Sequence, residues 1–219
     1  MKIGDLHDWN LDPKGAVALQ RELAPQLISD TPIALDRIKS IAGVDVSVRR
    51  KRSRAAVVVM RYPQLDTIEI ARAEREASFP YIPGLLAFRE GPVILDALRQ
   101  LQCDPDAFIF DGMGQIHPRK MGIAAHLGLW LQRPTIGCGK THFIGEFVEP
   151  ASEKGSSSAL HHRDEQIGAV LRTRARVKPV YVSVGHLADL ASAVKLILSA
   201  TTRYRLPEPV RAAHNAARL

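Results

Sequence analysis

The sequence predicts an α/β fold in which helices flank a mixed central sheet. Three strand-like segments, at residues 41–48, 55–62 and 67–77, are separated only by short turns, which is typical of an antiparallel meander. Beyond them, helical and strand patterns alternate, which indicates parallel pairing. The 219 residues are 46% hydrophobic and 24% charged, enough for a sizeable core. We expect one domain, residues 1–219.

The individual elements follow from local patterns. Asp12 and Pro13 supply the N-cap and first residue of a helix whose apolar side chains recur at helical spacing as far as Leu27. After the meander we expect, in order, a helix at 85–101, a strand at 107–110, a helix at 122–131, strands at 135–139, 142–148, 167–174 and 178–184, a helix within 183–204, and a short helix after Pro209. The serine-rich segment 151–158 is predicted to be a loop.

Composition excludes several classes of protein. The longest apolar run, Ala55–Met60, is far shorter than the roughly 20 residues of a membrane helix, and the opening residues show no signal-peptide pattern. We therefore expect a cytoplasmic protein with no membrane partner, acting as a monomer. Cys103 and Cys138 are too few for a disulfide framework or a cysteine zinc site.

The net charge of +7 favours a polyanionic partner such as nucleic acid. The excess is uneven, because residues 49–54 carry a net +5 and residues 163–178 and 200–219 carry +3 each. We expect the first and last of these segments to flank an acidic site and to contact a phosphate backbone.

Two carboxylates lie on predicted strands. Asp45 shares one face of its strand with Gly43 and Ser47, where burial is costly without a compensating charge, although a hydrogen-bonded structural Asp also fits. Asp111 follows strand 107–110 at its carboxyl end, where a turn-forming Asp is the simpler alternative. Together, two such acids in one sheet favour a Mg²⁺ site, and Glu90 on the next helix offers a third oxygen ligand unless it is merely solvated.

Other polar groups stand near these acids in the sequence. Gly112 permits close approach of a ligand, and His117 could hydrogen-bond or titrate. Lys140 follows a glycine-rich stretch that is not a nucleotide-binding P-loop, because Pro134 stands where that pattern requires Gly. Lys140 is therefore either a charge partner for phosphate or a solvated lysine.

A loop stiffened by two prolines carries an aromatic side chain. Pro80 and Pro83 flank Tyr81 and Ile82, which could be exposed as a wedge between stacked bases. The alternative is that Tyr81 packs into the core of its own chain. His214, taken alone, would be a surface histidine.

Taken together, these segments resemble the endonuclease V family, nucleases that repair deaminated adenine. The matching pieces run in family order: 41–47, the block PYIPGLLAFREGP at 80–92, Asp111-Gly112 with 117–119 and 122–128, 134–137 with Lys140, 178–183 with Gly185-His186, and 204–214. The sequence departs from the family pattern at Met113, Gln115-Ile116, Cys138-Gly139 and Val184.

The resemblance implies a ribonuclease H-like fold with a five-stranded mixed sheet. It also implies that Asp45, Glu90 and Asp111 bind Mg²⁺ or Mn²⁺, while Lys140 and His214 position phosphate and nucleophile. The implied substrate is DNA containing deoxyinosine, nicked at the second phosphodiester bond on its 3′ side to give 3′-hydroxyl and 5′-phosphate ends. The implied recognition elements are a wedge, Tyr81 with Pro80, Ile82 and Pro83, and a base pocket of Gly84, Leu85, Gly112, His117 and Gly122.

Three alternatives remain at this point. A ribonuclease H-like resolvase or exonuclease would use the same acids on nucleic acid structure, but the proline-flanked Tyr81 favours a lesion. An inosine-specific ribonuclease is a second possibility, since inosine-containing RNA is chemically close to the implied substrate. A nucleic-acid-binding module without catalysis suits the basic charge but gives the three acids no role.

Overall fold

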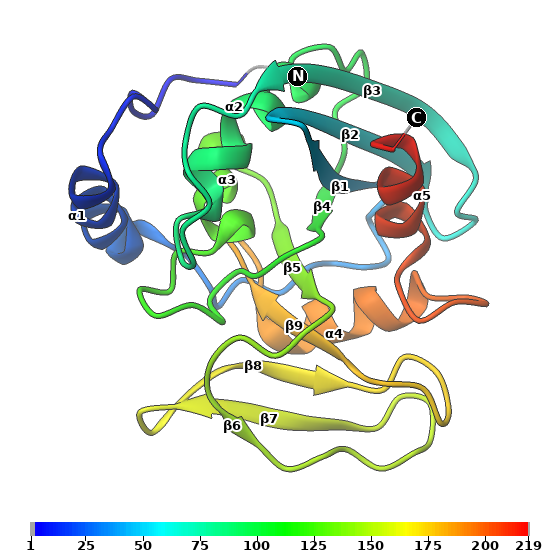
Figure 1. Cartoon of the computed structure of the whole chain (residues 1–219). Coiled ribbons are helices and arrows are strands. Elements are labelled where there is room, and N and C mark those ends of the chain that lie inside the picture. Colours follow the sequence, from blue (N-terminus) through cyan, green and yellow to red (C-terminus); the bar gives the residue numbers. More distant parts are fainter. Residues whose placement is uncertain (1–2, 219) are drawn as a thin grey trace.

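One sheet of nine strands organises residues 3–218, the part of the chain that this computed structural model describes (Figure 1). The strand order is β3-β2-β1-β4-β5-β9-β8-β7-β6. The strands are β1 (Ser40–Arg49), β2 (Arg52–Arg61), β3 (Thr67–Glu76), β4 (Ala107–Phe110), β5 (Thr135–Gly139), β6 (Glu146–Phe147), β7 (Ser157–His162), β8 (Glu165–Leu171) and β9 (Val180–Val184). β1–β3 form the predicted antiparallel meander, and β4 and β5 run parallel to β1, so the mixed α/β sheet is confirmed.

Helices cover both faces of this sheet (Figure 1). They are α1 (Pro13–Leu23), α2 (Leu86–Leu98), α3 (Ile123–Leu131), α4 (Leu190–Ser199) and α5 (Glu208–Ala216), with a short 3₁₀ helix at Ala24–Gln26. α2 and α3 bury one face of the sheet, which includes Val44 and Phe110, whereas α4 and α5 bury the other, which includes Ile41 and Ile109. Within residues 3–218, none of the helices has the length and apolar character needed to cross a membrane.

α5 lies directly against β1. A Cβ built at Gly43 would overlap the backbone carbonyl of Pro209, so only a residue without a side chain allows this approach. Pro209 itself is tolerated because it stands in the first turn of α5, where a helix needs no N–H donor. The close contact places the end of α5 over the face of β1 that carries Asp45.

The structure corrects the sequence predictions beyond β5. The pairing there is antiparallel, and β9-β8-β7-β6 extend the five strands β3-β2-β1-β4-β5 to nine. Strand 142–148 is only Glu146–Phe147, and β7 was missed because its first residues were assigned to the serine-rich loop. β7 buries one residue, Leu160, so its sequence lacks the alternation that identifies a strand.

Several element boundaries also differ from the predictions; the first helix ends at Leu23, and the predicted strand 167–174 is Glu165–Leu171. The turn between the first two strands consists only of Arg50 and Lys51, and the neighbouring arginines belong to β1 and β2. α4 begins at Leu190, after a left-handed Leu187. The last helix begins at Glu208 rather than after Pro209.

Candidate active site

Two neighbouring parallel strands bring Asp45 and Asp111 together. Val44 on β1 pairs with Phe110 on β4, and the Asp111 N–H donates to the Val44 carbonyl at 2.9 Å. The two acids therefore follow paired positions. The alternation along β1 turns Asp45 to the face of Gly43, as predicted, and α5 covers that face. Ligand atoms of Asp45, Asp111 and His214 all lie within 4.8 Å of one another.

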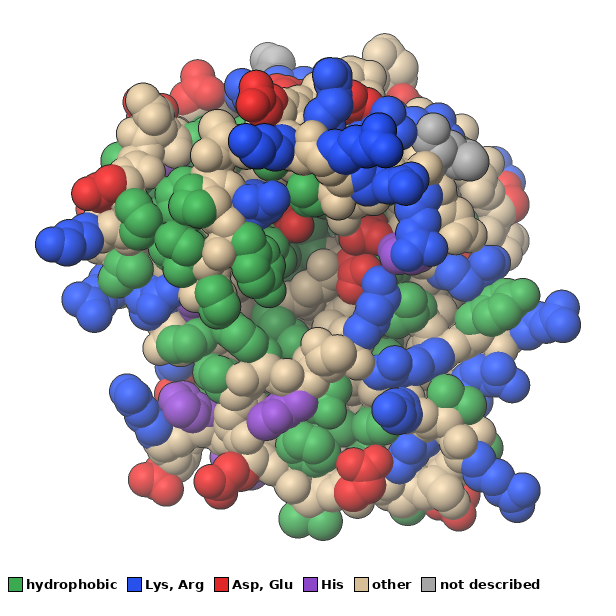
Figure 2. All heavy atoms as spheres, viewed as in Figure 1, with side chains coloured by type: hydrophobic (Ala, Val, Ile, Leu, Met, Phe, Trp, Pro, Cys, Tyr) green, Lys and Arg blue, Asp and Glu red, His purple; other side chains and the backbone are tan. Residues whose placement is uncertain are grey.

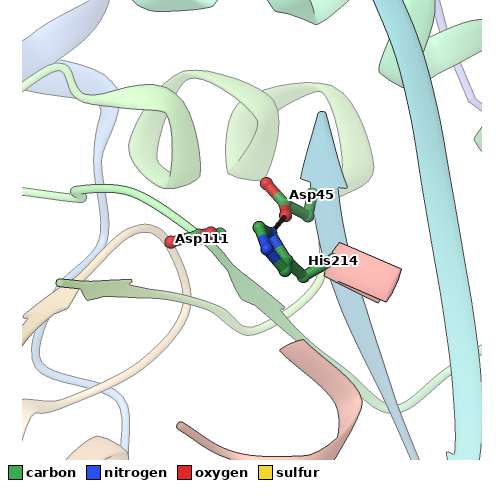
Figure 3. A group of neighbouring side chains, drawn as sticks. All are labelled: Asp45, Asp111 and His214. Carbon is green, nitrogen blue, oxygen red and sulfur yellow. Dashed lines mark hydrogen bonds and ion pairs between the residues drawn. The ribbon is translucent and has the colours of Figure 1, made fainter. Parts of the chain in front are cut away.

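His214 reaches this pair from α5. Figure 3 shows its ring against Asp45, with Asp111 beside them. Its Nδ1 lies 2.6 Å from Oδ2 of Asp45. Because a carboxylate accepts, Nδ1 carries the proton, which leaves Nε2 as the ring nitrogen able to accept one. His214 is thus no ordinary surface histidine.

Crowded carboxylates dominate the electrostatics of the site. Burial and the Asp111 charge raise the pKa of Asp45 to about 6, although His214 and Lys140 act in the opposite direction. Burial, together with the charges of Asp45 and Asp111, raises the pKa of Glu90 on α2 to about 8. Glu90 is thus an electrostatic neighbour of both acids, but it lies outside the group of ligand atoms within 4.8 Å. A site that resists ionisation of its own carboxylates favours a bound cation.

Lys140 directly follows β5 and pairs with Asp111. Its Nζ contacts Oδ2 of Asp111, and its backbone carbonyl accepts a 2.6 Å hydrogen bond from Nη2 of Arg205. The same Arg205 nitrogen donates to the Pro179 carbonyl, also at 2.6 Å. Lys140 is therefore paired with an acid of the site and is not merely solvated, and its contact with phosphate stays a prediction. Arg205 was not singled out from the sequence, because its contacts depend on a fold-back across 65 residues.

A cavity of about 370 Å³ opens beside Asp111 and Lys140. Among its lining residues are Tyr81, Ile82, Pro83, Gly84, Gly112, His117 and Gly122, together with Met113, Met121 and Phe143, which the sequence had not assigned to a pocket. We call it the base cavity. Tyr81 is 71% exposed at its rim, so the alternative that it packs into the core is wrong. Pro80 is exposed outside the lining, and the side chain of Leu85 is buried against Phe88.

The carbonyl of Gly84 is the fixed point of the cavity wall. It accepts hydrogen bonds from Nε2 of Gln20 at 3.0 Å, Nε2 of His117 at 2.9 Å and Nη2 of Arg119 at 2.9 Å. Nδ1 of His117 accepts from the N–H groups of Arg119 and Met121, both at 3.2 Å, so the ring is neutral and protonated at Nε2. Burial lowers the pKa of His117 to about 4. His117 therefore holds the wall in place, and no sequence signal identified Gln20 as a second donor to the Gly84 carbonyl.

Comparisons with known proteins agree with this architecture. The family model for endonuclease V matches residues 21–215. This chain belongs to the endonuclease V family. The endonuclease V of Methanothrix thermoacetophila is 47% identical over 214 residues, covering 98% of this chain and 94% of the relative. The resemblance to this family that the sequence motifs indicated is thus confirmed.

Solved endonuclease V structures confirm the ribonuclease H-like fold. The Bacillus subtilis enzyme superposes with a TM-score of 0.96 at 33% identity, covering 100% of this chain and 96% of the other. The Ciona intestinalis endonuclease V has a TM-score of 0.83 at 26% identity, covering 95% and 97%. The latter was solved in complex with DNA containing an inosine followed by a ribo-adenosine.

Proposed function

We propose that this endonuclease V is a DNA repair enzyme that nicks DNA at the second phosphodiester bond on the 3′ side of deoxyinosine. The products are a 3′-hydroxyl and a 5′-phosphate. The observation that carries the proposal is the juxtaposition of an acidic pair, whose side chains are 10% and 12% exposed, with a cavity of a size to hold one base. The inosine-containing DNA bound by the Ciona intestinalis relative supports the choice of lesion.

The donor set suits a hard divalent cation, which we take to be Mg²⁺ with Mn²⁺ as a substitute. Asp45 and Asp111 would hold it, with Glu90 as the third carboxylate. The raised pKa values of Asp45 and Glu90 support this assignment, because a bound positive charge favours the ionised form of both acids. When bound, the cation supplies Lewis-acid stabilisation of the charge that develops on the phosphate.

The protein's own groups complete the chemistry. Nε2 of His214 is free to accept a proton from an attacking water, while the Asp45 carboxylate fixes the ring through Nδ1. The Lys140 ammonium, held beside Asp111, faces the base cavity and is placed to contact a phosphate oxygen. Each of the two acids thus has its own partner, His214 at Asp45 and Lys140 at Asp111.

Recognition is assigned to the base cavity. The everted base would enter between the Gly84 wall and the loop at Gly112, while Tyr81, at the rim, would fill the gap it leaves in the duplex. A structure-specific resolvase needs no such cavity beside its acids. The geometry therefore favours a lesion-reading nuclease over the structure-specific alternative.

The test is nicking of matched duplexes with and without one deoxyinosine in the presence of Mg²⁺, with an inosine-containing RNA arm. We expect a single nick at the proposed bond, located by product length. Asp45→Asn and Asp111→Asn should each slow nicking by at least about 100-fold while DNA affinity changes only several-fold. Asp104→Asn, which removes an exposed acid paired with Arg133, is the matched control. Undiminished nicking by either site variant would contradict the mechanism.

A further inference from the structure

A second cavity lies on the other side of the acidic pair. It has a volume of about 300 Å³ and is formed by the tip of the β1–β2 hairpin and the residues that follow α5. Its lining consists of Ser47, Arg49, Arg50, Arg52, Arg54, Ala217 and Arg218. We call it the arginine cavity. Neither the acidic pair nor the base cavity uses any of these side chains.

Two features of the tip of this hairpin are unfavourable for stability. Arg50 and Lys51 form a two-residue turn with φ angles of 48° and 66°, a left-handed geometry for which Asn and Gly are the favoured residues. Arg49 and Arg52 stand directly opposite each other across the strands, where like charges repel. A bound anion would explain both features, because it would interact favourably with the positive side chains at the tip.

Little negative charge from the protein compensates these arginines. Glu74 on β3 pairs with both Arg52 and Arg54. Within residues 3–218, Glu74 is the carboxylate partner in these ion pairs. Arg49, Arg50 and Arg218 form no ion pair there. One carboxylate therefore orients two arginines, and the cavity as a whole stays strongly positive.

The position of the cavity relates it to the substrate. Ser47 lies two residues after Asp45 on the same face of β1, and Ala217 lies three residues after His214. The base cavity instead borders Asp111 and Lys140. Figure 2 shows acidic side chains inside a hollow, with apolar side chains on its left and Lys and Arg side chains over its upper edge. A strand whose base enters the base cavity would cross the acids and continue to the arginines.

We propose that the arginine cavity binds backbone phosphates of the cleaved strand on the far side of the scissile bond from the everted base. The inference rests on the proposed function for its direction: with the cut 3′ to deoxyinosine, these phosphates lie 3′ to the cut. The contacts are to phosphate alone, so they add affinity without reading sequence.

The first experiment measures the salt dependence of DNA affinity in EDTA, where no hydrolysis occurs. Arg49→Gln/Arg50→Gln should lessen the slope of log affinity against log salt by about 1 to 2, equally on inosine and undamaged duplexes. Arg174→Gln/Arg176→Gln is the matched control, because both residues are exposed and Arg176 is also left-handed, with φ of 60°. The control should keep the wild-type slope.

Two further arms make the result decisive. Arg49→Lys/Arg50→Lys preserves the charge and should restore the slope, which a merely misfolded hairpin would not explain. Shortening the duplex on the 3′ side to the cut should abolish the difference between wild type and the Gln variant, whereas shortening the 5′ side should preserve it. An unchanged slope in the Gln variant, or a difference that survives 3′ shortening, would overturn the inference.

The outcome is separable from that of the proposed function. If the wild-type protein fails to nick deoxyinosine duplexes, the proposed function fails. The salt slope on the undamaged duplex still reports whether the arginine cavity contacts phosphate, because that arm needs neither cleavage nor a lesion.

Discussion

The two sides of the acidic pair differ in how fully their polar and charged groups are paired. On the side of the base cavity, one carbonyl, that of Gly84, is satisfied by three donors, and His117 uses both of its ring nitrogens. On the side of the arginine cavity, like charges face each other and a single carboxylate, Glu74, serves two arginines. Under the proposed function, a neutral base would meet groups whose hydrogen bonds are already made, whereas phosphates would meet arginines that have few carboxylate partners.

Gly43→Ala should disturb both sides at once and gives the largest expected effect. The added Cβ must push α5 away from β1, taking His214 from Asp45 and Arg218 from the arginine cavity. We expect destabilisation of about 1–3 kcal/mol, measured by urea unfolding. Nicking should fall by about 100-fold, as expected when catalytic groups are misplaced by about an ångström. Gly4→Ala, where a Cβ meets nothing within 4 Å, is the control. Retained nicking would show that α5 does not position the site.

His117→Ala should damage only the side of the base cavity. It removes one of the donors to Gly84 and leaves the N–H groups of Arg119 and Met121 without their acceptor, which costs about 1–3 kcal/mol. We expect discrimination between inosine and adenine duplexes to fall by about 10- to 100-fold. The salt slope of binding should not change. In the control His161→Ala, at an exposed residue, both the discrimination and the salt slope should stay as in wild type. A changed slope would mean that the two sides are not independent.

Acid should lower the free energy of unfolding through His126, which lies on the helix beside the base cavity. This residue lies on α3, whose first residue Ile123 lines the base cavity, and burial lowers the pKa of its ring to about 3. Since the unfolded chain takes up a proton near pH 6.5, the free energy of unfolding is unaffected above that pH and falls progressively between 6.5 and 3. Lowering the pH from 7 to 5 should cost about 2 kcal/mol from this group.

Two variants isolate that contribution from other titrations. His126→Gln should flatten the stability profile between pH 7 and 5, measured by urea unfolding, although burying an amide there lowers stability at every pH. His161→Gln changes an exposed histidine on β7 and should keep the wild-type profile. Equal slopes for the His126 variant and wild type would assign the acid sensitivity elsewhere. His7 must be considered with it, because its Nε2 lies 2.6 Å from Nε2 of His126.

Tyr81→Ala should give the smallest effect on the protein itself. With 71% of the side chain exposed, its loss should change the free energy of unfolding by less than about 0.5 kcal/mol. Lesion preference should fall several-fold while affinity for undamaged duplex stays unchanged, measured by competition between the two duplexes. Ile68→Ala, an exposed apolar residue on β3, serves as control. Unaltered preference would remove Tyr81 from recognition.

Local patterns in the sequence identified most of the elements near the site. The meander, the helix that begins at Pro13 and strand 107–110 follow from periodicity and capping, and alternation alone turned Asp45 to the correct face of β1. β7 and the short β6 were harder, because these polar strands at the end of the sheet carry little hydrophobic alternation. The role of Glu90 as third carboxylate stays a prediction, because the group of ligand atoms within 4.8 Å contains Asp45, Asp111 and His214.

The sequence by itself determined the fold class, the family and the faces on which single residues stand, because backbone periodicity fixes a side chain's direction within its own strand or helix. Only the tertiary structure decided which distant groups meet. His214 reaches Asp45 across 169 residues, and Gln20 reaches Gly84 across 64. The arginine cavity likewise closes only when Arg218 folds back over the β1–β2 hairpin. Such contacts depend on how closely helices pack on the sheet, as at Gly43, and no local pattern encodes that distance.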